Sequence, residues 1–208
     1  MRRRRADAER NRDKLLDAAS ALVMEGRGAL SLAAVAERAG VGIGTLYRHF
    51  HSRDALLAAL YRNEVERLQA AAETLARELP PLEALKAWLD RYAALMMVKH
   101  GFADAMKSAM KSDAEIFTDS RSRLASALTS LLDAAADAGA VRCDVQAEDI
   151  LIAVAAQVSA SLHGEGAEKR CRRLLGLTLD GLRYGAVADR PDLTAADRPP
   201  LEVDVASA

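Results

Sequence analysis

The sequence predicts an all-α protein with a small N-terminal domain of three helices and a larger helical C-terminal domain. Half of the 208 residues are apolar but only 4% are aromatic, and alanine and leucine abound, a composition that favours helices over sheets. Apolar residues recur three and four positions apart along most of the chain, which is the spacing of amphipathic helices. Glycines and prolines divide these runs into segments of helical length.

The first helix is predicted over residues 8–25, where Leu15, Ala19 and Leu22 form a buried stripe before Gly26. Residues 31–39 form a second, shorter helix, with Ser31 as its N-cap and Gly40 as the residue that ends it. A third short helix begins within three or four residues of Gly40. Two short helices joined by a tight turn that contains glycine form a helix-turn-helix, whose second helix can lie in the major groove of DNA.

The third helix has the side chains that this role requires. Leu46 and Phe50, four residues apart, can anchor it to the domain core together with Val41. Its other faces carry small residues that permit close approach and donors that reach phosphates or base edges, namely Gly42, Ile43, Thr45, Tyr47, Arg48 and His49. We therefore interpret this segment as a DNA-reading helix.

Residues 10–60 closely resemble the N-terminal domain of TetR-family transcriptional regulators. The resemblance rests on the run from Leu32 to Gly42, on Gly-Thr-Leu-Tyr-Arg-His-Phe at 44–50, and on Ser-Arg-Asp-Ala-Leu-Leu at 52–57. His51 departs from the pattern, because family members often carry proline there, and this leaves the geometry of that loop open. The resemblance implies a helical C-terminal domain with an effector site and a dimer interface.

The family motif Thr-Leu-Tyr-x-x-Phe implies that Thr45, Tyr47 and His49 contact phosphates. Gly42, Ile43 and Arg48 would then lie nearest the base edges, with Arg48 able to bond a guanine in two places. We expect Arg53, at the start of the next helix, and Ser31, at the start of the second, to add phosphate contacts.

The charge distribution agrees with a DNA-binding end. Residues 1–53 hold eleven lysines and arginines against six acids, whereas the rest of the chain is acidic, and the total charge is −1. Such a basic end would orient the protein towards a phosphate backbone. Arg2 to Arg5 form an arm that we expect to be too short and too charged to fold alone. This arm either enters the minor groove or attracts phosphates as a nonspecific tail.

A long helix is predicted over residues 53–78, with Ser52 as its N-cap. At ~1.5 Å per residue it would be near 38 Å long, enough to connect two domains. Pro80 and Pro81 end it, and further helical runs follow over residues 82–99, 102–112, 114–138, 147–163 and 168–184. The predicted organisation is thus a DNA-binding domain over 1–53, a connecting helix over 54–79, an effector-binding and dimerisation domain over 80–186 and a loose tail over 187–208.

The C-terminal domain holds candidates for an apolar effector pocket. Met and aromatic side chains adapt to irregular apolar space, and the predicted lining is Trp88, Tyr92, Met96, Phe102, Met106, Met110, Phe117 and the polar Gln157. The alternative is that these residues are ordinary core.

The last two helices are the predicted dimer interface. The resemblance implies that they pair with their two-fold copies as a four-helix bundle, and the predicted contacts are Val154, Val158, Leu162, Leu174, Leu175, Leu179 and Leu182. The alternative is that both stripes pack inside one subunit.

No catalytic constellation, metal motif or cofactor-binding loop is present in the sequence, so we predict no enzyme activity, no cofactor and no metal. No apolar run approaches the length of a membrane span, and two isolated cysteines favour a reduced compartment, so we expect a cytoplasmic protein without membrane partners. The predicted function is a homodimeric transcriptional regulator, a repressor that binds a palindromic operator in double-stranded DNA and is released by a small, largely apolar effector. The alternative is an architectural or general DNA-binding protein without an effector.

Overall fold

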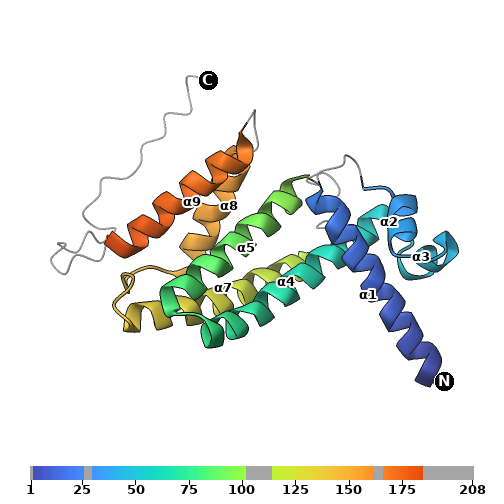
Figure 1. Ribbon diagram of the computed structural model, residues 1–208, viewed down its shortest axis with the longest axis horizontal. Helices are drawn as coiled ribbons and strands as arrows, with labels where there is room; N and C mark the ends of the chain where they lie inside the picture. The colour runs from blue at the N-terminus through green and yellow to red at the C-terminus, as the bar shows by residue number, and fades with distance from the viewer. Residues whose placement is uncertain (1, 26–29, 102–113, 162–165, 185–208) are drawn as a thin grey trace.

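The computed structural model describes residues 2–25, 30–101, 114–161 and 166–184 of the chain. These residues form eight helices and no strand, which confirms the predicted all-α fold. The helices are α1 (Arg2–Met24), α2 (Leu32–Arg38), α3 (Ile43–His49), α4 (Arg53–Glu78), α5 (Pro81–Gly101), α7 (Ala114–Asp137), α8 (Ala147–Ser161) and α9 (Ala167–Tyr184) (Figure 1).

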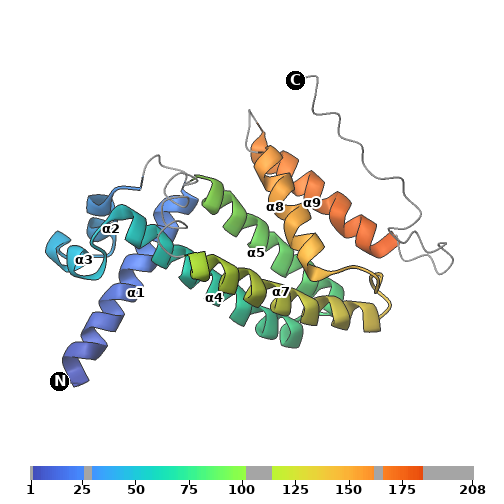
Figure 2. The same ribbon diagram turned by 180° about the vertical axis from the view of Figure 1, so that it is seen from behind.

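The helices gather into an N-terminal head and a C-terminal body. Helices α1, α2 and α3 lie together at one end of the molecule, and α4 leaves them to run beside α5 and α7 (Figures 1 and 2). The α8–α9 pair packs on the body through α5 and α7. Helix α4 begins at a true N-cap, because the Ser52 hydroxyl accepts a hydrogen bond from the Ala55 N–H at 3.1 Å. With 26 residues α4 is about 39 Å long, close to the length predicted for the connecting helix.

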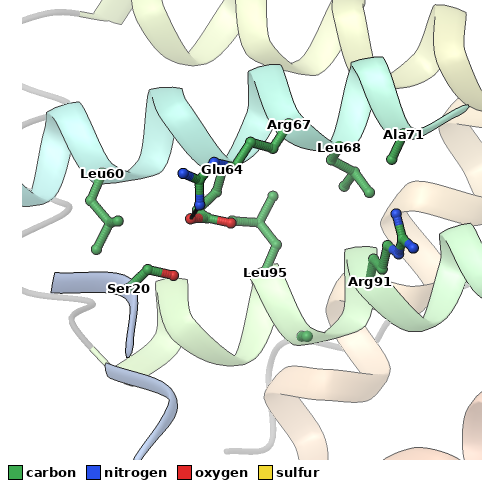
Figure 3. A pocket seen from close by; sticks show the side chains of 9 residues that line it. Ser20, Leu60, Glu64, Arg67, Leu68, Ala71, Arg91 and Leu95 are labelled. Atoms are coloured by element: carbon green, nitrogen blue, oxygen red, sulfur yellow. Dashed lines mark ion pairs between the residues drawn. The ribbon is translucent and has the colours of Figure 1, made fainter. Parts of the chain in front are cut away.

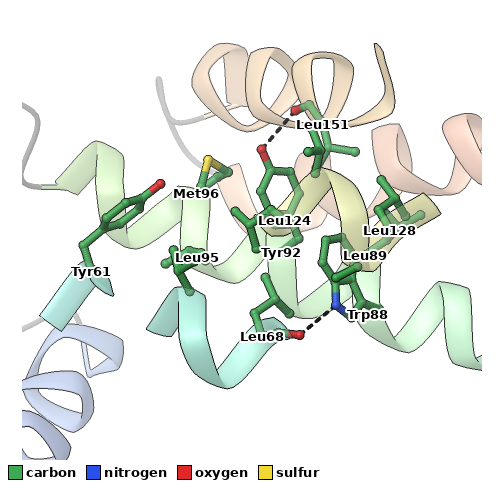
Figure 4. Close-up of a cluster of buried hydrophobic side chains, with 14 of the residues drawn as sticks. Tyr61, Leu68, Trp88, Leu89, Tyr92, Leu95, Met96, Leu124, Leu128 and Leu151 are labelled. Carbon is green, nitrogen blue, oxygen red and sulfur yellow. Dashed lines mark hydrogen bonds between the residues drawn. The ribbon is translucent and has the colours of Figure 1, made fainter. Parts of the chain in front are cut away.

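Helix α5 is held at the centre of the body by two buried hydrogen bonds. The Trp88 indole N–H donates to the Leu68 carbonyl of α4 at 2.9 Å, and the Tyr92 hydroxyl donates to the Leu151 carbonyl of α8 at 3.1 Å (Figure 4). The two rings stack with centroids 5.8 Å apart. These bonds allow large, partly polar side chains to fill the core without leaving a buried donor unpaired.

Helix α1 differs from the sequence prediction, because it begins at Arg2 rather than at residue 8. The four consecutive arginines therefore form the start of α1, which corrects the expectation of a separate basic arm. No glycine or proline lies between residues 2 and 24, and arginine and alanine both favour the helix, so nothing in the sequence ends it earlier. The N-terminal turns of α1 project away from the rest of the head (Figure 1).

Several predicted features lie outside the described residues. They are Phe102, Met106, Met110 and Leu162, together with the predicted tail over 187–208. Phe117 belongs to α7, but its side chain lies outside the description. None of the helices within the described ranges combines the length and apolar character that a membrane crossing requires.

Candidate nucleic-acid interface

The turn between α2 and α3 is set by one glycine. Gly40 has a φ of +67°, a left-handed backbone conformation that glycine adopts without steric cost. The Gly40 N–H donates to the Glu37 carbonyl, and the Val41 N–H donates to the Ala36 carbonyl, both at 3.0 Å. This is the Schellman pattern of helix termination, and it reverses the chain so that α3 starts only five residues after α2 ends.

The inner face of α3 is anchored in the head. Leu46 is fully buried and Phe50, at the C-cap, is 3% exposed. The Phe50 N–H donates to the Leu46 carbonyl at 2.8 Å, and the Arg12 guanidinium of α1 lies 5.9 Å from the centre of the Phe50 ring. Because both anchors lie on one side of so short a helix, its opposite side is directed to solvent.

The outer face of α3 displays the side chains that were predicted to read DNA. Ile43 is 45% exposed and Tyr47 is 53% exposed. Gly42 and Arg48 are exposed as well, whereas Thr45 and His49 are half-buried at the edges of this face. None of the six predicted residues of α3 and its N-cap is therefore buried, in contrast to Leu46.

The two other predicted contacts flank this surface. Ser31 is exposed at the N-cap of α2, and its hydroxyl makes no capping hydrogen bond. Arg53 is half-buried at the first position of α4. Arg38, the last residue of α2, forms an ion pair with Glu25, the residue after α1, at 2.7 Å and so connects the two helices.

Gly44 is exposed on α3 but was not among the residues predicted to contact DNA. It is the second residue of α3, it is exposed, and its φ is not positive. A Cβ added there would have no atom within 4 Å. The fold of the free protein therefore does not need glycine at this position. The sequence feature that could have pointed to Gly44 is a glycine within a helix, where glycine is unfavourable.

Both parts of the chain match known families. Residues 15–60 match the family described as "Bacterial regulatory proteins, tetR family", and residues 80–184 match the family described as "Transcriptional regulator SbtR-like, C-terminal domain". The second match alone covers about half of the 208 residues. The chain belongs to the TetR family of transcriptional regulators. The family resemblance of residues 10–60 is thereby confirmed.

Two solved structures of TetR-family proteins match most of this chain. A TetR transcriptional regulator from Streptomyces coelicolor is 44% identical, with 83% of this chain and 98% of that chain covered and a TM-score of 0.72. A TetR transcription regulatory protein from Mycobacterium vanbaalenii is 30% identical, with 86% and 98% covered and a TM-score of 0.58. The transcriptional repressor KstR from Mycolicibacterium smegmatis is 42% identical over 73 residues. That match spans 34% of this chain and about a third, 36%, of KstR.

The described members of the predicted effector pocket lie in the C-terminal body. Trp88, Tyr92 and Met96 are at most 5% exposed and fill the core. Burial also raises the pKa of the Tyr92 hydroxyl. Gln157 lies between α8 and α9, where its amide donates to the Thr178 hydroxyl at 2.8 Å. A cavity lined by other described residues lies between α1, α4 and α5.

Most of the predicted dimer contacts are occupied within one subunit. Val154, Val158, Leu175, Leu179 and Leu182 are each 9% exposed or less, and Leu174 is half-buried. The open face of the α8–α9 pair carries other apolar side chains, with Ile152 at 52%, Leu177 at 66% and Tyr184 at 67% exposure. The sequence pattern could not separate these faces, because both helices carry apolar residues on more than one side.

Proposed function

We propose that this chain is a homodimeric repressor that binds a palindromic operator through two copies of α3 and releases it when a small effector binds. The observation that carries the proposal is the outer face of α3, where reading side chains surround an anchored Leu46. A rigid short helix with one buried side presents its other side in a fixed orientation, which sequence reading requires.

The roles within this face follow from their chemistry. Tyr47, Thr45 and His49 donate to phosphates and set the position of the helix. Arg48 is the side chain best suited to bond a guanine in the major groove, and Ile43 offers an apolar contact to a thymine methyl group. Ser31 and Arg53 add phosphate contacts at the two ends of the surface.

Dimerisation is proposed through the open face of α8 and α9. Ile152 is followed at four-residue spacing by Ala156 and Ala160, all exposed. On α9 the exposed face continues with Leu177, Gly181 and Tyr184, which are four and three residues apart. Large apolar side chains beside small ones allow two helix pairs to approach closely. Two heads related by a two-fold axis then read two half-sites.

Release requires an effector with different affinities for two head positions. The physical route is α4, because it packs on α1 in the head and on α5 and α7 in the body. A change in the body therefore moves the head, and the spacing of two α3 helices no longer fits successive major grooves. We place this activity in the cytoplasm, where the DNA is.

The deciding experiment is selection of bound DNA from a random duplex pool by the full-length protein at ~150 mM salt, where nonspecific phosphate binding is weakened. The proposal expects recovery of a palindromic site and two subunits per site. Recovery of no preferred sequence, with a steep loss of affinity as salt rises, would instead support the alternative of a general DNA-binding protein.

A further inference from the structure

A cavity of about 260 Å³ lies where the head meets the body, between α1, α4 and α5. Its walls are mainly apolar and include Leu60 and Leu68 of α4 together with Ala94 and Leu95 of α5. Ser20 of α1 closes it from the head side (Figure 3). The volume is slightly below the 300–1,000 Å³ of typical ligand pockets, so a compact molecule would fill it.

The polar wall of this cavity is formed by Glu64 and Arg67 of α4. Arg67 of α4 hydrogen-bonds to Asp17 of α1, and its Nη1 also lies 3.5 Å from Oε1 of Glu64. The bond to Asp17 raises the pKa of Arg67 above its usual value, so Arg67 stays a cation. Two carboxylates thus share one guanidinium.

The unsatisfied atom in this cluster is Glu64 Oε1. It is buried, yet it makes no hydrogen bond with any described residue, and 3.5 Å is too long for the usual bond between a guanidinium and a carboxylate. A buried carboxylate oxygen without a donor is costly, and a donor supplied from the cavity would remove that cost. Figure 3 shows the Glu64 carboxylate between Ser20 and Leu95, on the side of the cavity that faces the head.

The remaining charged residue of the lining, Arg91, lies at the other end. It is exposed and lies near Ala71 in Figure 3. Glu64 and Ala71 are seven residues apart on α4, which corresponds to ~10 Å along the helix. The exposed Arg91 therefore lies nearer the Ala71 end of the cavity than Glu64 does.

We propose that this cavity is a regulatory site for a small organic cation, a primary or secondary amine on a compact hydrocarbon body. Its ammonium group donates to Glu64 Oε1 and the Ser20 hydroxyl, and its hydrocarbon part packs against Leu68 and Leu95. The class follows from the carboxylate oxygen Glu64 Oε1, which lacks a hydrogen-bond donor, and from the apolar walls.

The site is placed to act on the head. Its lining joins Ser20 on α1 to residues of α4 and α5, and the Asp17–Arg67 bond beside it is a direct tie between head and body. An ammonium group at Glu64 competes with Arg67 for that carboxylate and changes the charge balance around the tie. The regulatory part of this inference rests on the proposed function, because it requires an operator whose affinity can change.

The test uses full-length protein and three size-matched probes: benzylamine, benzyl alcohol and benzoate. Calorimetry at pH 7.5 should show benzylamine binding at least about tenfold more tightly than the neutral and anionic probes, as a charged hydrogen bond provides. Glu64→Gln keeps the shape but removes the charge, and should abolish this preference. Glu66→Gln, an exposed neighbour on α4 that does not line the cavity, is the matched control and should bind like the wild type.

A second variant tests whether benzylamine binding needs the open cavity as well as the charge of Glu64. Ala94 is half-buried, so Ala94→Phe fills the cavity from its rim and should block benzylamine while the melting temperature shows that the variant is folded. Equal binding of all three probes, no binding of benzylamine, or an unchanged preference in Glu64→Gln would each overturn the site.

Regulation is measured separately with the operator recovered by selection. Saturating benzylamine should weaken operator binding by the wild type and not by Glu64→Gln, and the operator should weaken benzylamine binding by the same factor. Benzylamine binding without any effect on the operator would overturn the regulatory role. Failure to recover an operator would count against the proposed function, while the calorimetric result on the site would still stand.

Discussion

Replacing Gly44 with alanine should raise the stability of the protein and weaken its binding to DNA. The added Cβ meets no atom within 4 Å, and the φ of Gly44 is not positive, so the folded backbone accepts alanine without strain. Alanine also restricts the unfolded chain, and together these effects should stabilise the protein by about 0.4–1 kcal/mol. The value should fall at the lower end, because Gly44 is only the second residue of α3.

The same methyl group should weaken DNA binding. It projects from the exposed face of α3, where we propose that the backbone approaches the DNA closely. Crowding a fitted interface by one methyl group costs about 1–3 kcal/mol, which corresponds to a loss of roughly 5- to 150-fold in operator affinity. Urea unfolding measures the stability, and fluorescence anisotropy with a labelled operator measures the affinity.

Gly40→Ala is the matched comparison, because it lies only four residues away but has a φ of +67°. Forcing alanine into that conformation should destabilise the head by about 1–2 kcal/mol. The two variants should therefore change stability in opposite directions. A Gly44→Ala protein that is more stable and binds the operator as tightly as the wild type would refute the close approach of α3 to DNA.

Three further predictions concern reading, assembly and pH. Tyr47→Ala should weaken binding to all operator variants alike, whereas Arg48→Ala should lose preference at one base pair by ~1–3 kcal/mol; uniform losses in both would contradict this division of roles. Leu177→Glu should dissociate the dimer in sedimentation experiments, whereas Leu79→Glu, at an exposed leucine on α4's C-cap, should not; dimers in both variants would exclude the proposed interface. Burial raises the pKa of Tyr61 from 10.0 to about 12. The unfolded chain therefore loses this proton first, and stability should fall as pH rises from 10 to 12, by up to ~1.4 kcal/mol per pH unit from this group. Urea titrations of Tyr61→Phe should show a shallower fall, and an unchanged slope would rule out Tyr61 as a source.

Much of the fold follows from patterns within short stretches of sequence. The 26-residue α4 was predicted between its observed bounds, because Ser52 caps one end and the prolines at 80 and 81 stop the other. The turn after α2 was also predictable from the sequence, because a glycine directly after a short amphipathic run indicates a left-handed residue that ends the helix. Gly40 adopts that conformation. The outward side of α3 followed from the spacing of Leu46 and Phe50. These features depend on interactions between residues a few positions apart, and such interactions are visible in the sequence.

Other features were decided only by packing between distant helices. Helices α8 and α9 have apolar residues on more than one side, and only their contact with α5 and α7 determined that Val154 and Leu179 face inward while Ile152 and Leu177 face outward. The burial of Trp88 and the hydrogen bond from its indole N–H to the Leu68 carbonyl likewise depend on the packing of α5 against α4.

The cavity at the head–body junction was not predictable for the same reason. Glu64 is one of many charged residues on a long helix, and its position beside Arg67 gives no sign of burial. Asp17 and Ser20 on α1 and Leu95 on α5 come together with it only after three helices have packed. The sequence by itself determined most of the helices and the exposed side of α3, because local periodicity and turn chemistry suffice for them. The tertiary structure decided which faces are buried and where charged groups meet, because these depend on contacts between residues far apart in the chain.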